Sequence, residues 1–435
     1  MHSPRLRPCR PLAVAPLLLV VAGLTFAAST FRAPAQDTPP PSRYALPPTD
    51  DGLPGAGPLR RYDWFTKLWL QLRTGWATRI EKDQGAVVFL GDSITQGWGD
   101  RLAKAFEGMK VANRGISGDT TRGVLIRLQD DVLSLRPSAV VLLIGTNDLE
   151  EQAEPETIAG NLKLILAALK QHDPKMPVVL CQVFPSSAEK KRPADQIKRI
   201  NELYAAAVKG DSRITLVETW PLFANPQGDA PASEFPDLLH LNDAGYAKWA
   251  SALRPILATL GFVETQPDDF QPEPGFTSLF DGRTLDGWGF KTNRFDGRTS
   301  SPDGRYVAKN GRLIVTTPAE GRRFQILWTA REFPKDFDLR LEFRATPNAD
   351  SGIFLRQPQL QCRDYLLAGP YKTLQAYRPQ DWNLIEVVAR NGIARCTCNG
   401  EVLEEAFKIP ATGPIGLEGD RGQMEYRRIR IRELP

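Results

Sequence analysis

Histidine is scarce in this chain, with three among 435 residues. None follows His240, so the cysteines of the C-terminal half, Cys362, Cys396 and Cys398, lack the fourth ligand that a tetrahedral zinc site needs. The glycine-containing stretch NRGISGD lacks the lysine of a phosphate-binding loop. We therefore expect neither a metal nor a nucleotide cofactor.

Long apolar runs are also few. The run at residues 12–28 follows three arginines and precedes the small-residue motif Ala33-Pro34-Ala35, which is the arrangement of a secretory signal peptide. A membrane anchor needs about 20 uninterrupted apolar residues, whereas a proline and a glycine interrupt this run. The sequence predicts cleavage near Ala35 and a secreted or periplasmic protein.

An excess of charge of one sign is missing too. The 55 Lys and Arg face 51 Asp and Glu, and the predicted signal peptide carries four arginines and no acid, which equals the whole net charge of +4. A mature chain near neutrality lacks the basic surface that binds nucleic acid or an anionic membrane. The arginines of RRIRIREL alternate with Ile429 and Ile431, as on a half-solvated strand. We expect no nucleic-acid partner and no membrane contact beyond the signal peptide.

The few cysteines leave one covalent option. Export would permit a disulfide from Cys362 to either Cys396 or Cys398, which lie two positions apart on a predicted strand and so share a face. Cys181 ends the apolar run PVVLCQVF, where we expect a buried thiol.

Proline and glycine are concentrated in two polar stretches, residues 36–61 and 263–274, whose composition is typical of linkers. The chain is also longer than one hydrophobic core usually serves. We therefore predict a signal peptide (1–35), a linker (36–61), a first domain (62–262), a second linker (263–274) and a second domain (275–435).

Short apolar runs alternate with amphipathic stretches of helical length through the first domain. Five buried strands that alternate with helices predict a parallel sheet covered on both sides. A helix predicted from Asp63 to about Lys82 carries Trp64, Trp69 and Trp76, which we expect in packing rather than in a binding platform. The predicted strands are Ala86–Leu90, Lys110–Asn113, Ala139–Ile144, Pro177–Val183 and Ile214–Glu218.

The second domain has a different pattern. FDLRLEFR alternates strictly between apolar and charged residues, as a strand with one buried face does. Asn-Gly pairs at Asn310, Asn391 and Asn399 lie between strand-like runs and favour hairpin turns. We therefore predict an all-β unit, a sandwich or jelly roll.

The chemistry is predicted around Ser93 in GDSITQGW, which follows the first predicted strand and begins a helix. Functional side chains of a parallel α/β sheet gather at the carboxyl ends of its strands. A serine nucleophile needs a base, but His2 leaves with the signal peptide and His172 precedes the fourth strand, at the opposite edge. His240 follows the fifth strand, and Asp237 lies three positions earlier, within reach of the imidazole ring. The sequence therefore predicts a triad of Ser93, His240 and Asp237.

An oxyanion hole is predicted from the backbone N–H of Ser93 and from two further strand ends. Gly115 follows the second strand and has no side chain to obstruct its N–H, while Asn147 follows the third strand and offers a neutral amide. We expect the neighbouring Asp92 and Asp148 to hold backbone amides in their loops rather than to act as acids.

These stretches, GDSITQGW, the loop of Gly115, GTND with Asn147 and DLLH with Asp237 and His240, resemble the four blocks of the SGNH (GDSL) hydrolase family, especially its platelet-activating-factor acetylhydrolase-like and carbohydrate-acetylesterase branches. The resemblance covers about residues 62–261. It implies a flavodoxin-like three-layer sandwich with Ser93 as nucleophile, the triad above, and Ser93, Gly115 and Asn147 as the oxyanion hole.

The second domain resembles the 3-keto-disaccharide hydrolase domain, a concanavalin-like jelly roll, in stretches such as GFTSLFDGRTLDGW, NADSGIFLR and TGPIGLEG. The resemblance implies a carbohydrate ligand and cleavage of 3-keto-glycosides. This sequence departs from the pattern at Gln359, where such domains tend to carry an acidic residue. Because a neutral amide cannot serve as a base, we expect this domain to bind carbohydrate rather than to cleave it.

The sequence thus predicts a secreted serine esterase that removes acyl groups, O-acetyl above all, from a carbohydrate held by the second domain. One alternative makes the second domain the main catalyst, a 3-keto-glycoside hydrolase or lyase with an accessory SGNH domain. Another is a non-catalytic surface protein that binds carbohydrate.

Overall fold

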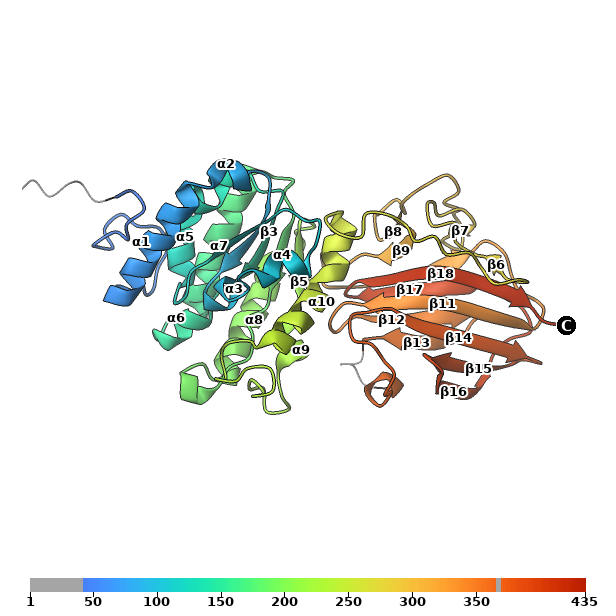
Figure 1. Ribbon diagram of the computed structural model, residues 1–435. Helices are drawn as coiled ribbons and strands as arrows, with labels where there is room; N and C mark the ends of the chain where they lie inside the picture. The colour runs from blue at the N-terminus through green and yellow to red at the C-terminus, as the bar shows by residue number, and fades with distance from the viewer. Residues whose placement is uncertain (1–41, 365–368) are drawn as a thin grey trace, which may run out of the picture. The chain divides into compact units, whose positions relative to one another are not determined.

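The computed structural model describes residues 42–364 and 369–435 (Figure 1). Tyr44–Pro435 form one compact unit. The predicted signal peptide and its cleavage site lie outside the described residues. No helix in the described part of the chain is long and apolar enough to cross a membrane.

The first domain is built on a five-stranded parallel sheet in the order β2-β1-β3-β4-β5. All five strands lie within two residues of their predicted positions, so this part of the predicted fold is confirmed. The strands are β1 (Val87–Gly91), β2 (Val111–Gly115), β3 (Ala139–Leu143), β4 (Val178–Cys181) and β5 (Ile214–Val217).

Helices cover both faces of this sheet (Figure 1). Successive residues of β1 show why, because Phe89 packs into one buried cluster with α10 while Val88 packs into another with α5, α7 and α8. The longer helices are α1 (Asp63–Ala77), α5 (Thr121–Asp131), α7 (Pro155–His172), α8 (Ala194–Val208) and α10 (Asp243–Leu260). The short ones are α2 (Ile80–Asp83), α3 (Ser93–Gln96), α4 (Arg101–Ala105), α6 (Thr146–Glu150) and α9 (Thr219–Phe223).

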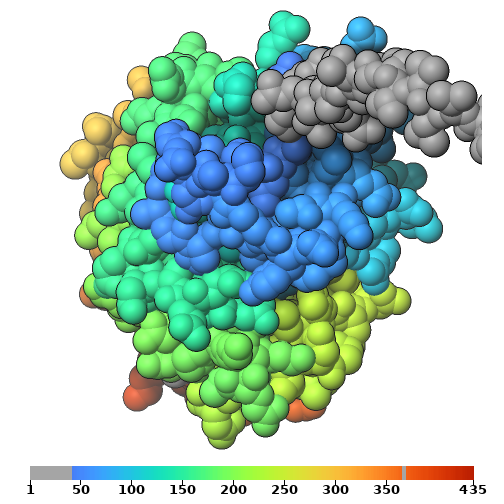
Figure 2. All heavy atoms as spheres, turned by 90° about the vertical axis from the view of Figure 1, so that its left-hand side faces the viewer, coloured from blue at the N-terminus to red at the C-terminus, as the bar shows by residue number. Residues whose placement is uncertain are grey.

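The predicted linkers are fastened where the structure describes them. Asp50 accepts a hydrogen bond from Arg122 of α5 at 2.6 Å, and Asn161 of α7 bonds both the N–H and the carbonyl of Ala56. Figure 2 shows this first described segment, in blue, spread over the neighbouring helices. In the second linker, Glu264 accepts from Arg344 of the second domain at 2.8 Å. These contacts could not be foreseen from the proline-rich composition.

The second domain consists of two antiparallel sheets, in keeping with the predicted jelly roll. One has the order β13-β12-β17-β10-β7 and the other β16-β15-β14-β11-β18-β9-β8, with β6 paired to β18. The strands are β6 (Thr277–Ser278), β7 (Trp288–Gly289), β8 (Tyr306–Lys309), β9 (Arg312–Val315), β10 (Arg322–Thr329), β11 (Phe337–Ala345), β12 (Asp350–Leu355), β13 (Gln359–Arg363), β14 (Asn383–Arg390), β15 (Ile393–Cys398), β16 (Glu401–Lys408), β17 (Ile415–Arg421) and β18 (Met424–Glu433).

The sequence signals of this domain have a direct structural basis. The alternating stretch FDLRLEFR forms β11, and its Leu339 and Leu341 are fully buried between the sheets. Asn310, Asn391 and Asn399 all have positive φ, which hairpin turns require and which asparagine tolerates.

The cysteines of the described residues are all free and buried, so neither disulfide that export would permit is formed. Burial raises the pKa of Cys396 and Cys398 to about 12. These thiols therefore act as small apolar side chains in the core.

Candidate active site

Ser93 lies at the first position of α3, directly beyond the carboxyl end of β1. Asp92 caps this short helix, because its Oδ1 accepts the N–H of Ile94 at 2.9 Å. The strand ends on Gly91, where a Cβ would overlap the carbonyl oxygen of Leu143 on β3. Glycine at position 91 therefore allows the ends of β1 and β3 to approach each other directly before Ser93.

His240 and Asp237 meet Ser93 at this edge, as predicted. The Nε2 atom of His240 lies 2.9 Å from Ser93 Oγ, and its Nδ1 atom lies 2.7 Å from Asp237 Oδ2. Asp237 Oδ1 also accepts the backbone N–H of His240 at 2.7 Å. The loop is held from outside by Ser186, whose hydroxyl donates to the carbonyl of Leu238 at 2.8 Å. The side chains of Asp237, His240 and Ser93 thus form one continuous chain of hydrogen bonds.

The histidine and the aspartate are open to solvent, with side-chain exposures of 45% and 46%. Partial burial alone would raise the pKa of Asp237. The hydrogen bonds from the backbone and ring of His240 outweigh it and bring the pKa to about 2. Asp237 is therefore ionised across the ordinary pH range.

The two other predicted oxyanion residues, Asn147 and Gly115, each already donate a hydrogen bond to a protein acceptor. Asn147 Nδ2 donates to the carbonyl of Asp119 at 2.9 Å, and the Gly115 N–H donates to Asn113 Oδ1 at 2.9 Å. The amide of Asn147 has a second N–H for an oxyanion, whereas a backbone N–H has only one. Gly115 remains a prediction that requires Asn113 to release it.

Sequence reasoning passed over Gly118, in the same loop. Its φ of +86° is the left-handed conformation that glycine adopts without strain. Within the described residues its N–H has no hydrogen-bond acceptor. The second glycine of NRGISGD was the available signal, and it offers a free donor where Gly115 does not.

Arg192 was also missed, because it is distant in sequence. It is 2% exposed, and its guanidinium donates to Asn147 Oδ1 and to the Thr146 carbonyl, both at 3.0 Å. These bonds fix which end of the Asn147 amide is the donor. Arg192 is thus a positioning residue.

The two flanking aspartates have the loop roles that we expected. Asp92 caps α3, and Asp148 accepts the backbone N–H of Thr121 at 3.0 Å. Burial raises the pKa of Asp92 to about 6 and that of Asp148 to about 7.

A second group of polar residues lies in the second domain, on the sheet that contains β17. Leu417 points into the core, so its neighbour Glu418 points to the opposite face. There Glu418 Oε2 accepts a hydrogen bond from Gln359 Nε2 of β13. Burial, and then the charges of Asp420 and Asp350, raise the pKa of Glu418 to about 7. A carboxylate therefore lies within hydrogen-bond distance of Gln359, although the neighbouring strand β17 and not β13 carries it.

A pocket of about 420 Å³ opens on this sheet and is lined by Trp328 and Phe354 among others, but not by Glu418 itself. Both rings pair across the sheet with Gly416, two residues before Glu418, so they share its face. Their centroids are 5.5 Å apart. The rings and Glu418, whose pKa is about 7, therefore lie on the same face of this sheet.

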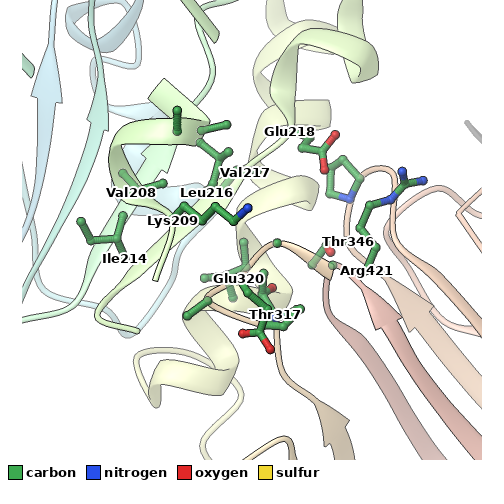
Figure 3. Close-up of a pocket in the computed structure, with 18 residues that line it drawn as sticks. Val208, Lys209, Ile214, Leu216, Val217, Glu218, Thr317, Glu320, Thr346 and Arg421 are labelled. Atoms are coloured by element: carbon green, nitrogen blue, oxygen red, sulfur yellow. The ribbon is translucent and has the colours of Figure 1, made fainter. Parts of the chain in front are cut away.

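Another pocket, of about 360 Å³, is lined by residues of both domains (Figure 3). Glu218, beyond β5, accepts a hydrogen bond from Asn348 at 2.6 Å, and burial raises its pKa. None of the residues of the predicted triad or oxyanion hole lines this pocket. We therefore assign it to the contact between the domains rather than to ester chemistry.

Comparison with known proteins matches both parts of the chain. Residues 89–248 match the GDSL-like lipase/acylhydrolase family, and residues 275–432 match the 3-keto-alpha-glucoside-1,2-lyase-like domain. Over 195 residues the chain is 31% identical to platelet-activating factor acetylhydrolase IB subunit alpha1 of Pongo abelii, covering 44% of this chain and 84% of that protein.

Two further similarities fall in the first domain. Subunit alpha2 of the Bos taurus platelet-activating factor acetylhydrolase IB is 28% identical over 207 residues, which are 47% of this chain and 88% of that protein. The structure of a GDSL-like lipase from Bacteroides thetaiotaomicron is 25% identical, covers 43% of this chain and 97% of its own, and has a TM-score of 0.38.

Proposed function

Because this chain belongs to the GDSL-like lipase/acylhydrolase family and is therefore a hydrolase of ester bonds, we propose that Ser93 is its nucleophile, His240 its base and Asp237 the group that orients the imidazole. The observation that carries the proposal is the hydrogen-bonded chain from Asp237 through His240 to Ser93, at 2.7 and 2.9 Å.

The reaction then runs in two steps. His240 Nε2 takes the proton of Ser93 Oγ as the oxygen attacks the ester carbonyl, and the alcohol leaves with that proton. Water, activated by the same nitrogen, then releases the acid from the acyl-enzyme. The second N–H of Asn147 and the N–H of Ser93 stabilise the oxyanion, with Gly115 or Gly118 as a further donor.

We propose an O-acetylated carbohydrate as the substrate. Three observations support it: acetylhydrolases are among the relatives, the second domain matches a sugar-active domain, and the half-exposed His240 and Asp237 leave room for a bulky alcohol. A signal peptide cleaved near Ala35 would place the enzyme outside the cytoplasm, with acylated carbohydrate as its partner. Amino-terminal sequencing of the exported protein tests that placement.

The test is acetate release from a panel of acetylated glycans, such as acetylated xylan, with Ser93→Ala as the control. We expect release by the natural protein and none by the variant. A fluorophosphonate probe should label Ser93. A folded protein that releases no acetate and resists the probe would instead favour the non-catalytic carbohydrate-binding alternative.

Glu418 favours a second candidate function, cleavage of 3-keto-glycosides by the second domain. In this reaction the Glu418 carboxylate would remove the proton at C2, which the C3 ketone acidifies, and the C1–O bond would break with the leaving oxygen taking up a proton. A group with a pKa of about 7 suits proton abstraction near neutrality. We expect Glu418→Gln to abolish cleavage of a 3-keto-glycoside and to leave p-nitrophenyl acetate hydrolysis intact, while Ser93→Ala does the reverse.

A further inference from the structure

Two aromatic side chains at the start of α1 are unusually exposed. Tyr62 and Trp64 are each 51% exposed, whereas Trp69 of the same helix is fully buried. Their rings are almost parallel, with an interplanar angle of 11° and centroids 6.4 Å apart. The sequence predicts that the tryptophans of this helix serve packing. Trp64 makes an edge contact with Phe65, but half of its side chain remains exposed.

The pair is anchored on the loop that follows β2. Phe65 and Trp69 pack with Ile116 of that loop. A Cβ added to Gly118 would lie 2.5 Å from Trp64 Cη2, so the indole covers this glycine. The carbonyl of the next residue, Asp119, is the one that accepts the Asn147 amide. Trp64 is therefore linked to Asn147 of the predicted oxyanion hole through two consecutive residues, Gly118 and Asp119.

A second set of contacts fastens the pair to α6, which carries Asn147. Tyr62 hydroxyl lies 3.4 Å from Glu151, and Arg60 donates to Glu151 at 2.7 Å. Arg60 also donates to Glu150. Figure 1 shows the first turn of α1 and α6 toward the same end of the α/β domain. The exposed rings thus have a fixed position relative to the loop of Gly118 and to the end of α6.

The chemistry of this rim suits a sugar ring. A pyranose presents a face of C–H bonds, whose positive edges are attracted by the negative face of an aromatic ring. Its hydroxyl groups can donate hydrogen bonds to the carboxylate of Glu150, whose side chain is 39% exposed, and to that of Glu151, which lies 3.4 Å from the Tyr62 hydroxyl. A purely apolar acyl chain would make no hydrogen bond to these carboxylates.

Resting on the esterase function proposed above, we propose that Tyr62 and Trp64 form a platform on which the sugar that carries the ester stacks while its acyl group enters the site of Ser93. The platform is a specificity determinant: it binds the alcohol part of the substrate, not the acyl part.

The test compares the full-length protein with its Trp64→Ala and Tyr62→Ala variants on acetylated xylo-oligosaccharide, p-nitrophenyl acetate and p-nitrophenyl octanoate. We expect KM for the oligosaccharide to rise about tenfold in Trp64→Ala, the usual worth of one aromatic stacking contact. The ratio of kcat/KM for oligosaccharide to that for p-nitrophenyl acetate should fall by the same factor, and Trp64→Phe should restore most of it. The matched control is Leu70→Ala, an exposed apolar residue further along α1.

A binding measurement excludes an effect on folding or on chemistry. In the Ser93→Ala background, acetylated oligosaccharide should bind and change tryptophan fluorescence, and Trp64→Ala should remove both. An unchanged ratio, or a loss confined to p-nitrophenyl octanoate, overturns the proposal, the latter by showing that the rings bind an acyl chain. Absence of all hydrolysis by the natural protein would refute the esterase function instead.

Discussion

Replacing Asp237 by Asn removes the negative charge beside His240 and reverses a hydrogen bond. The carboxylate accepts from His240 Nδ1 at 2.7 Å, so the proton sits on Nδ1 and Nε2 is free to act as the base. An amide nitrogen at that position donates instead, which forces the proton onto Nε2. Nε2 then presents an N–H group to Ser93 Oγ, so the imidazole cannot accept the serine proton.

The magnitude follows from the pKa of Asp237, which falls from 3.8 to about 2. Nearly two pKa units correspond to about 2.5 kcal/mol. The carboxylate is 46% exposed, so solvent screening leaves on the order of 1 kcal/mol, and the backbone N–H groups of His240 and Leu239 supply part of that. The wrong tautomer adds the larger loss, since the equivalent change in a buried triad costs about 10⁴ in kcat. For this open site we expect kcat to fall about 10²- to 10³-fold.

The assay is steady-state hydrolysis of p-nitrophenyl acetate at pH 7 to 8. Asp243→Asn is the matched control, because Asp243 is an exposed aspartate three residues after His240 that pairs with Arg101. It should retain nearly full activity, and both variants should melt within a few degrees of the natural protein. If Asp237→Asn keeps more than a tenth of the natural kcat, the assigned tautomer is wrong.

Three further predictions rest on buried polar contacts. Arg192→Met frees the Asn147 amide to rotate, so kcat on p-nitrophenyl acetate should fall about tenfold to a hundredfold with little change in KM; a change in KM alone would contradict the positioning role. Asn348→Ala leaves the half-buried Glu218 without its donor and should lower the free energy of unfolding by about 1 to 2 kcal/mol in denaturant melts, whereas an unchanged midpoint would show that the contact is solvated. Because burial raises the pKa of Asp148 to about 7, the folded state holds that proton more tightly than the unfolded chain, so this group's stabilisation is present below pH 4 and is lost as the pH rises toward 7. Melting curves from pH 4 to 8 should therefore be flatter in Asp148→Asn, and parallel curves would count against the shift.

The first domain was predictable because its strands are buried on both faces. A parallel strand covered on both sides is a short continuous apolar run, such as VVFL, and the helices between such runs have their own period. The edge at which Ser93 and His240 meet follows from that alternation, since both follow strands in the same direction. The sequence could not reveal the turn of Leu238, whose positive φ and bond to Ser186 shape the histidine loop.

The features that sequence reasoning did not find depend on partners that are remote in the chain. Glu418, the hydrogen-bond partner of Gln359, lies 59 positions away on β17, so the sequence does not show that the two side chains meet. Trp64 looked like a packing residue, because helical spacing groups it with buried Trp69. Exposure and cross-strand pairing are properties of the folded chain, and no local pattern encodes them.

Glu150 shows how such remote contacts unite the site. Its Oε2 accepts from Arg192, which holds Asn147, and from Arg60, which lies beside the aromatic pair. Partial burial alone would raise the pKa of Glu150, but Arg192 and Arg60 outweigh it and lower the pKa. The carboxylate is therefore ionised wherever an imidazole base is neutral, and it holds both guanidinium groups throughout the working range. The proposed oxyanion donor and the proposed sugar platform are thus both linked to one charge, so our proposal includes the N-terminal segment that carries Arg60 in the site.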